Sequence, residues 1–223
     1  MEKIIVHIRP LNWTQGEVYS MAFKITGEQP AVRINWGDGT IRTYYGQEII
    51  ANHVYPKDET LLFIIEAEIL SGQIDYCDST GADCSNELVD FSQAPSIKRV
   101  DCDMFEKVIF DNPALETLSL RLSLGANYDL SKLPNLKKLV FDGCDRKMKC
   151  LDLSNCHNLE YLQCWCYNTP ELQLIVPNDA PIKYIDISGN NFSGGLLATL
   201  HRIIEQTGGE IVGEFENDED DEE

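Results

Sequence analysis

The feature that most constrains the fold of this chain is an internal repeat in its second half. Five segments between residues 97 and 188 fit the pattern apolar-x-x-apolar-x-apolar, and their fourth positions lie 18, 21, 23 and 23 residues apart. These positions are Val100, Leu118, Leu139, Leu162 and Ile185. A period of ~20–29 residues is typical of chains that stack one short strand per repeat, because each repeat buries its apolar face against its neighbours.

A second apolar register lies between the repeated segments, with steps of 22, 21 and 21 residues. Its members are Val108, Leu130, Leu151 and Leu172. Each repeat is therefore expected to hold one strand and a second short extended segment on the opposite edge. Three positions after the last apolar residue of a strand, an Asn or Cys side chain would fit a buried turn. Cys144, Cys156 and Asn190 occupy such places.

These repeats resemble the leucine-rich repeats of bacterial cell-surface proteins. The segment "LDLSNCHNLEYLQC", residues 151–164, is close to a consensus of that family. The resemblance implies a short solenoid over residues 72–215, entered at "GQIDYC", residues 72–77. The end repeat of a solenoid needs a polar cover. The sequence predicts a capping helix with Ser193 as its N-cap and with Gly208 and Gly209 at its end.

The first seventy residues alternate apolar and polar side chains over short runs, which is typical of strands. "AVRINW" and "TIRTYY" are two such runs, and only Gly37, Asp38 and Gly39 separate them. Asp-Gly between two strands is a strong hairpin signal, because Gly adopts the positive φ that the turn needs at little cost. These three residues are therefore interpreted as a structural turn rather than as a metal or phosphate loop.

This part of the chain resembles the polycystic-kidney-disease-type (PKD) domain. "INWGDGT" at 34–40 is followed by "NHVY" at 52–55, and both segments match the family's motif; "PKDET" then departs from it, where the family has a Gly turn. The resemblance implies a non-catalytic, immunoglobulin-like β-sandwich over residues 1–71, with His53 packed in it. The whole chain is predicted to be mainly β (α+β).

Charge excludes some functions. The chain has 37 acidic and 18 basic residues, which gives a formal net charge of −19. Such a field repels nucleic acid and anionic membranes. Residues 216–223, "ENDEDDEE", are predicted to be a disordered acidic tail, and calcium capture by it is the less favoured alternative.

The compartment stays open between two readings. No apolar stretch is long enough for a membrane-spanning helix, and the first residues lack the pattern of a signal peptide. The protein is then either cytoplasmic, or at the cell surface, in the periplasm or outside the cell if an export signal has been removed. Eight cysteines fit either case,. In an exported protein, a disulfide between Cys77 and Cys84 is conceivable.

Catalytic, metal and cofactor sites are not expected. The cysteines lack the paired spacing typical of zinc sites, although Cys156, His157, Cys164 and Cys166 lie close in sequence,. The four histidines adjoin no nucleophile motif, and no P-loop or dinucleotide motif occurs,.

Binding is the favoured function, and the repeat geometry indicates where. The side chains between the buried positions of each strand would line a concave sheet that is open to a partner. The candidate binding residues are Arg121, Lys138, Tyr161, Gln163, Trp165, Tyr184 and Asp186. Three of them are aromatic, and exposed aromatic side chains mark binding sites. The alternative is that a C-terminal loop or the other domain covers them.

The sequence thus predicts a monomeric protein without catalytic activity that recognises a protein or glycan through its repeats, with the sandwich as spacer. One alternative is a carbohydrate-processing accessory module or enzyme, which would show His, Asp or Glu around a deep pocket. Another is an intracellular scaffold, which free thiols at all eight cysteines would favour.

Overall fold

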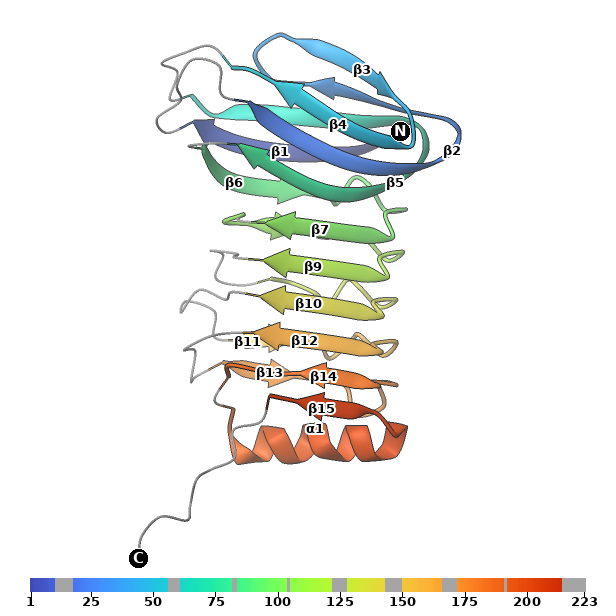
Figure 1. Cartoon of the computed structure of the whole chain (residues 1–223), viewed down its shortest axis with the longest axis vertical. Helices are drawn as coiled ribbons and strands as arrows, with labels where there is room; N and C mark the ends of the chain where they lie inside the picture. Colours follow the sequence, from blue (N-terminus) through green and yellow to red (C-terminus); the bar gives the residue numbers. More distant parts are fainter. Residues whose placement is uncertain are drawn as a thin grey trace, which may run out of the picture.

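The structure is a computed structural model of the chain, and it is mainly β (Figure 1). It describes residues 1–10, 18–55, 61–81, 84–103, 105–121, 128–142, 150–165, 172–190 and 192–213, without the side chains of 77–81 and 84. Within these ranges there are fifteen strands and one helix. The acidic tail and the proposed disulfide between Cys77 and Cys84 lie outside what the structure describes.

The first part of the fold is a set of antiparallel strands around an apolar core. The strands are β1 (Glu2–Pro10), β2 (Tyr19–Asn35), β3 (Ile41–Tyr45), β4 (Glu48–His53), β5 (Phe63–Gly81) and β6 (Cys84–Asp90). β1 lies between β5 and β6, and β2 pairs with β3, β4 and β5. Gly27 and Gly72 face each other where β2 and β5 bend, and a Cβ on Gly27 would lie 3.1 Å from the Gly72 Cα.

The second part is a stack of short parallel strands in chain order (Figure 1). They are β7 (Arg99–Asp103), β9 (Thr117–Arg121), β10 (Lys138–Asp142), β12 (Tyr161–Trp165), β14 (Tyr184–Asp186) and β15 (Glu210–Val212). The repeated segments of the sequence form the first five, and their fourth positions pair in register from Val100 to Ile185. That row of side chains has no exposed surface, so the apolar period of the sequence marks the core side of the stack.

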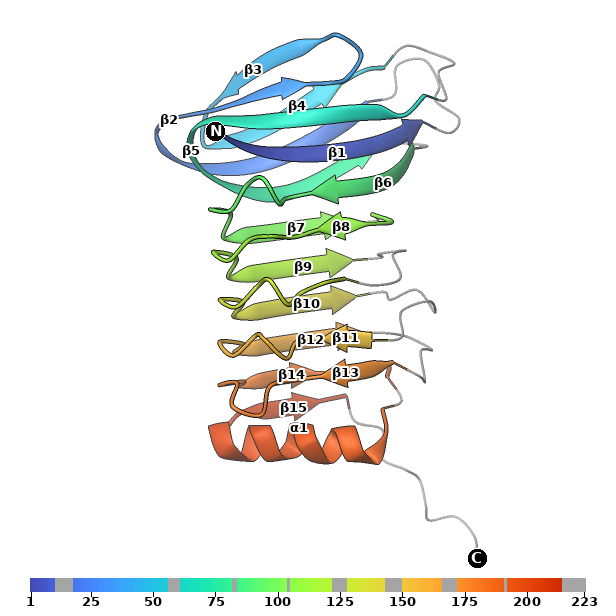
Figure 2. The same cartoon turned by 180° about the vertical axis from the view of Figure 1, so that it is seen from behind.

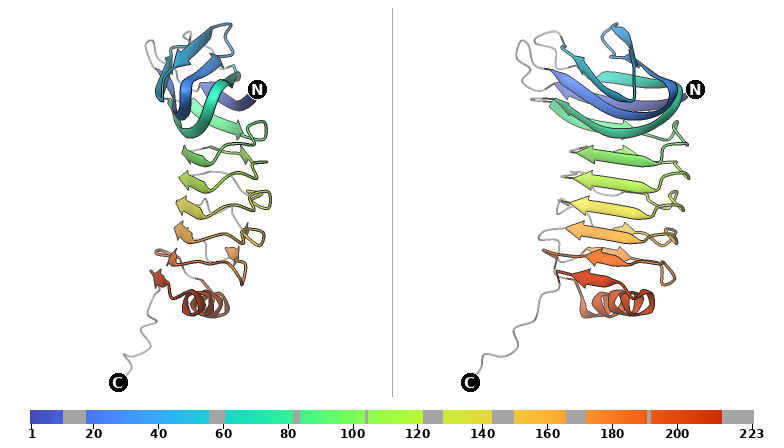
Figure 3. Two further views of the ribbon diagram at one scale, coloured as in Figure 1. Left: turned by 90° about the vertical axis from the view of Figure 1, so that its right-hand side faces the viewer. Right: turned by 45° about the vertical axis from the view of Figure 1, so that its right-hand side comes forward.

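The returning chain forms shorter elements on the opposite side of the stack (Figures 2 and 3). They are β8 (Val108–Ile109), β11 (Cys150–Asp152) and β13 (Gln173–Ile175). The second apolar register is only partly in strands. Val108 and Leu151 lie in strands, whereas Leu130 and Leu172 do not. The strand partner of Leu151 is Leu174, not Leu172. Leu130 and Leu172 are buried all the same, so the register follows burial and not strand formation.

Helix α1 (Gly194–Thr207) covers the end of the stack next to β15 (Figure 1). Ser193 is its N-cap residue and Gly208 its C-cap in the left-handed region, with φ of 68°, as the sequence predicts. The Ser193 side chain makes no capping hydrogen bond. The buried residues Leu200, Ile203 and Ile204 face the stack, so α1 shields the apolar interior at this end.

The expected boundary between residues 71 and 72 falls inside β5, which runs without a break to Gly81. β6 then returns to pair with β1, and Tyr76 of β5 pairs in parallel with Val100 of β7. The hydrogen-bonded sheet is continuous from β6 to β15. The two parts are therefore joined in one hydrogen-bonded sheet, while the division into domains stays a prediction of the sequence.

Buried asparagines hold the turns between strands. The Asn190 side-chain amide donates to the Cys164 and Ile187 carbonyl oxygens. Asn112, which the repeat pattern did not single out, is fully buried and donates to the Phe91 and Ala94 carbonyl oxygens at 2.8 and 2.7 Å. A buried carbonyl without a donor is costly, so these amides are structural.

Replacing Asn112 with Ala should lower the free energy of unfolding by about 2 kcal/mol, because two buried carbonyl oxygens would lose their donor. The matched control is Asn135→Ala. The Asn135 amide makes a similar bond to the Pro113 carbonyl oxygen at 2.8 Å, but it is exposed, so water can replace it. Urea unfolding of both variants would measure the difference, and equal losses would contradict the role of burial.

Candidate binding face

The outward side chains of β7, β9, β10, β12, β14 and β15 form one surface, here called the strand face. Because the strands pair in parallel register, equivalent side chains line up in rows across the stack. One row contains Lys138, Tyr161, Tyr184 and Glu210. Figure 3 shows the strands in a nearly straight column. The strand face is thus an open surface, and its concavity stays a prediction.

The structure brings together the predicted residues at the centre of the strand face. The rings of Tyr161 and Tyr184 are stacked, with centroids 4.8 Å apart and planes 15° apart. The Lys138 Nζ lies 4.4 Å from the Tyr161 centroid, within the range of a cation–π interaction. The Tyr161 hydroxyl donates to Gln163 Oε1 at 3.0 Å. The two tyrosines are partly exposed and Lys138 is exposed.

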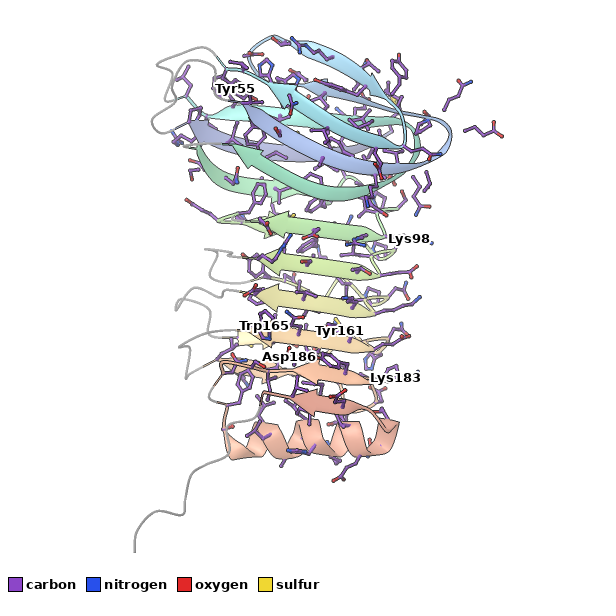
Figure 4. The ribbon with its side chains drawn as sticks, in the orientation of Figure 1. Tyr55, Lys98, Tyr161, Trp165, Lys183 and Asp186 are labelled. Carbon is purple, nitrogen blue, oxygen red and sulfur yellow. The ribbon has the colours of Figure 1, made fainter. Side chains whose placement is uncertain are left out.

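Trp165 and Asp186 form the neighbouring part of this face (Figure 4). Trp165 is partly exposed, whereas Asp186 is 7% exposed. The Asp186 Oδ1 accepts a bond from the Ser188 N–H at 3.0 Å. Burial alone would raise the pKa of this carboxyl, but Ser188 and the nearby Trp165 N–H together outweigh that effect and lower it. The Trp165 Nε1 makes no hydrogen bond of normal geometry with the described residues, so the hydrogen bond that fixes the Asp186 carboxyl is the one from Ser188.

The predicted residue Arg121 is engaged within the protein. Its guanidinium lies 3.1 Å from Asp101 Oδ1 and 2.9 Å from Asp103 Oδ1. Burial alone would lower the pKa of Arg121, but the two carboxylates outweigh burial, so the net shift of the pKa is upward. For Asp103, burial outweighs the attraction of Arg121 and raises the pKa. Arg121 therefore anchors neighbouring strands, and it is separated from the tyrosines by β10.

The tyrosines lie in a negative environment. Burial raises the pKa of Tyr161, and Tyr184 and Asp186 raise it further. The pKa of Tyr184 is raised by burial and then by Asp186 and Glu210. Both phenols therefore stay protonated at pH 7, and the carboxylates of Asp186 and Glu210 act on Tyr184. Sequence reasoning missed Glu210, because the strand Glu210–Val212 has no LxxLxL pattern and follows the capping helix.

The structural turn lies far from the strand face, in the first part of the fold. Gly37 and Gly39 have φ of 86° and 92°, in agreement with a glycine turn. Asp38 Oδ1 accepts from the Thr40 N–H at 2.9 Å, and Asp38 Oδ2 lies 2.7 Å from His53 Nε2. The His53 ring stacks on Trp36 with centroids 4.8 Å apart, and His53 is 6% exposed. These contacts fit the predicted structural roles of Asp38 and His53.

Cysteine chemistry has little support among the described residues. Cys102, Cys156 and Cys164 are buried, and burial raises the pKa of Cys156 to about 11 and of Cys164 to about 12. Such thiols are poor nucleophiles, because the reactive form is the thiolate. Cys144 and Cys166 lie outside the described residues. Within the described ranges, no group of His, Cys, Asp or Glu could hold a metal ion.

One pocket of about 220 Å³ lies in the first part, away from the strand face. Lys3, Arg33, Asn35, Ile41, Glu66 and Glu68 line it. Arg33 pairs with Glu68 and Lys3 pairs with Glu66, so the charges of its lining are matched. Ion pairs of this kind stabilise a sheet surface modestly.

Comparison with protein-family models, curated proteins and solved structures found no match to this chain. Within the described residues, no helix has the length and apolar character needed to cross a membrane.

Proposed function

We propose that this chain is a non-catalytic binding protein that recognises a protein or glycan through the strand face. The observation that carries the proposal is the cluster of Lys138, Tyr161, Tyr184 and Trp165 on neighbouring strands. Tyr and Trp bury a large area on binding at small entropic cost, and clusters of them dominate many interfaces. Backbone pairing on both sides fixes the strands that carry them, so the face is preorganised.

The proposal also assigns a domain type to each of the two parts, the antiparallel strands and the parallel stack. The parallel strands, whose apolar period is 18–23 residues, support a leucine-rich-repeat domain. The turn at Asp38, with its contacts to His53 and Trp36, supports a PKD-like sandwich. The sandwich would then act as a spacer that presents the strand face, and the chain would work as a monomer at a bacterial cell surface.

Tyr161→Ala and Trp165→Ala test the proposed function. Ligands would first be identified by screening the purified protein against a glycan array and a displayed protein library. Each variant should then weaken binding by at least about tenfold, since a central aromatic contributes ~2 kcal/mol. Tyr45→Ala is the control, because Tyr45 is 77% exposed on β3 and away from the face. The proposal fails if Tyr161→Ala and Trp165→Ala bind every identified ligand as the parent does.

A further inference from the structure

The stack of tyrosines on the strand face is asymmetric at its two ends. Tyr161 has one ring face against Tyr184 and Lys138 over the ring. Tyr184 has one ring face against Tyr161, and Glu210 is its in-register neighbour on the other side. The tyrosine stack thus has a cation, Lys138, on its β10 side and an anion, Glu210, on its β15 side. Both outer residues, Lys138 and Glu210, are exposed.

The arrangement at the Glu210 end is electrostatically incomplete. The face of an aromatic ring carries negative potential, so it attracts a cation and repels a carboxylate. Glu210 and Asp186 both act on Tyr184 and raise its pKa in addition to burial. Within the described residues, no ion pair joins a Lys or Arg to Glu210 or Asp186. A cation between the Tyr184 ring and Glu210 would be attracted by both groups.

We propose that the Tyr184 ring, Glu210 and Asp186 form a site for the guanidinium or ammonium group of a basic segment in a partner protein. This inference rests on the proposed binding function of the strand face and names the chemistry of its ligand. The bound cation would occupy, at one end of the tyrosine stack, the place that Lys138 has at the other. Carboxylates on two neighbouring strands would hold its N–H groups.

Charge and ring access favour a basic protein segment over a glycan. A sugar packs on an open ring face. In the tyrosine stack, Tyr184 and Lys138 cover the Tyr161 ring, and Tyr161 covers one face of Tyr184. The one open face is that of Tyr184 on the side of Glu210. Of the positive side chains on the strand face, Lys138 lies over the Tyr161 ring and Arg121 pairs with Asp101 and Asp103, so neither neutralises Glu210. The net charge of −19 also attracts a basic partner from a distance and speeds its association,.

The probe is an acetylated and amidated Gly-Arg-Gly-Arg-Gly peptide, compared with the same peptide carrying citrulline, the neutral isostere of Arg. NMR titration of the ¹³C-labelled tyrosine rings would report binding at Tyr184. The Arg peptide should shift the Tyr184 signals and bind at least about tenfold more tightly than the citrulline peptide, because only Arg carries the charge. Shifts confined to the first part of the fold would overturn the site.

Matched variants separate the site from general attraction to an acidic protein. Glu210→Gln and Tyr184→Leu should each weaken Arg-peptide binding by at least about fivefold. Glu205→Gln removes the same charge from an exposed position on α1 and should change binding less than about twofold. Equal losses for Glu205→Gln and Glu210→Gln would overturn the proposal, because they would indicate only long-range attraction.

The remaining outcomes distinguish this inference from the proposed function. Equal binding of the Arg and citrulline peptides, or no binding of either, overturns the cation site. If a neutral oligosaccharide or another protein then binds in a manner that depends on Tyr161 and Trp165, the strand face remains a binding surface for a different ligand. If no ligand from the screens depends on those residues, the proposed function fails as well.

Discussion

Replacing Gly37 with Ala should lower the free energy of unfolding by about 4 kcal/mol, through a backbone clash together with backbone strain. A Cβ at this position would lie 2.8 Å from the Ile64 carbonyl oxygen and 3.1 Å from the Ile64 nitrogen. Both atoms are backbone, so β5 would have to move. The positive φ of 86° adds strain of ~1–2 kcal/mol for any residue with a Cβ,.

Gly39→Ala is the matched control for Gly37→Ala. Gly39 lies in the same turn at φ of 92°, but a Cβ there would have no atom within 4 Å. Its cost is therefore the backbone strain alone, about 1–2 kcal/mol. Urea unfolding monitored by circular dichroism would measure both variants. Similar losses at the two positions would show that strain dominates and that the close approach of β5 has no energetic weight.

The repeat pattern predicted the stack of strands well, because burial repeats with the chain. Val100 and its equivalents have no exposed surface, and a chain that must bury one apolar row per repeat keeps the period visible in sequence. Leu172 illustrates where this fails. Leu172 is apolar and buried but lies outside β13. The prediction failed here because an apolar residue indicates burial and carries no information on backbone pairing.

The long strands of the first part were harder to predict. β5 continues past residue 71, and after a register shift its pairing with β2 resumes between Gln73 and Thr26. In the sequence, a Gly after an apolar run indicates the end of a strand. The pairing of β6 with β1 joins residues more than seventy positions apart, and a local pattern contains no signal for such contacts.

The candidate site was predictable to the extent that strand alternation determines which side chains point outward. Tyr161 and Tyr184 were expected on one face from their equivalent positions in the repeat, and their rings do stack. The burial of Asp186 and the ion pairs of Arg121 with Asp101 and Asp103 depend on side-chain conformations and neighbours across strands. Those arise only when the strands are in register.

Replacing Asp38 with Ala should lower the free energy of unfolding by about 3 kcal/mol. Because a carboxylate only accepts hydrogen bonds, the contact with His53 Nε2 at 2.7 Å must be donated by the histidine,. His53 is 6% exposed, so its N–H would lose its acceptor in a place that water enters poorly. The Thr40 N–H would lose its acceptor too. Losing the partner of a buried polar group costs ~1–3 kcal/mol, and more where charge is involved.

Asp38→Asn provides the control and a test by pH. The asparagine retains an oxygen for the Thr40 N–H but removes the charge, so its loss at pH 7 should be smaller, about 1–2 kcal/mol. Burial raises the pKa of Asp38, but the bonds from Thr40 and His53 outweigh it and lower the pKa below 3.8. A lowered pKa in the folded state means that the charged form contributes stability fully above the unfolded pKa, and that this contribution is lost as pH falls through the folded pKa.

The stability difference between the parent and Asp38→Asn should therefore shrink as the pH falls below 3.8, where the Asp38 carboxylate becomes protonated,. Thermal unfolding at a series of pH values would record it. A difference that stays constant down to pH 2 would mean that Asp38 contributes through its shape and not through its charge. Binding to any ligand of the strand face should be unaffected at pH 7, because the turn joins β2 and β3 in the first part of the fold, away from β12 (Figure 1).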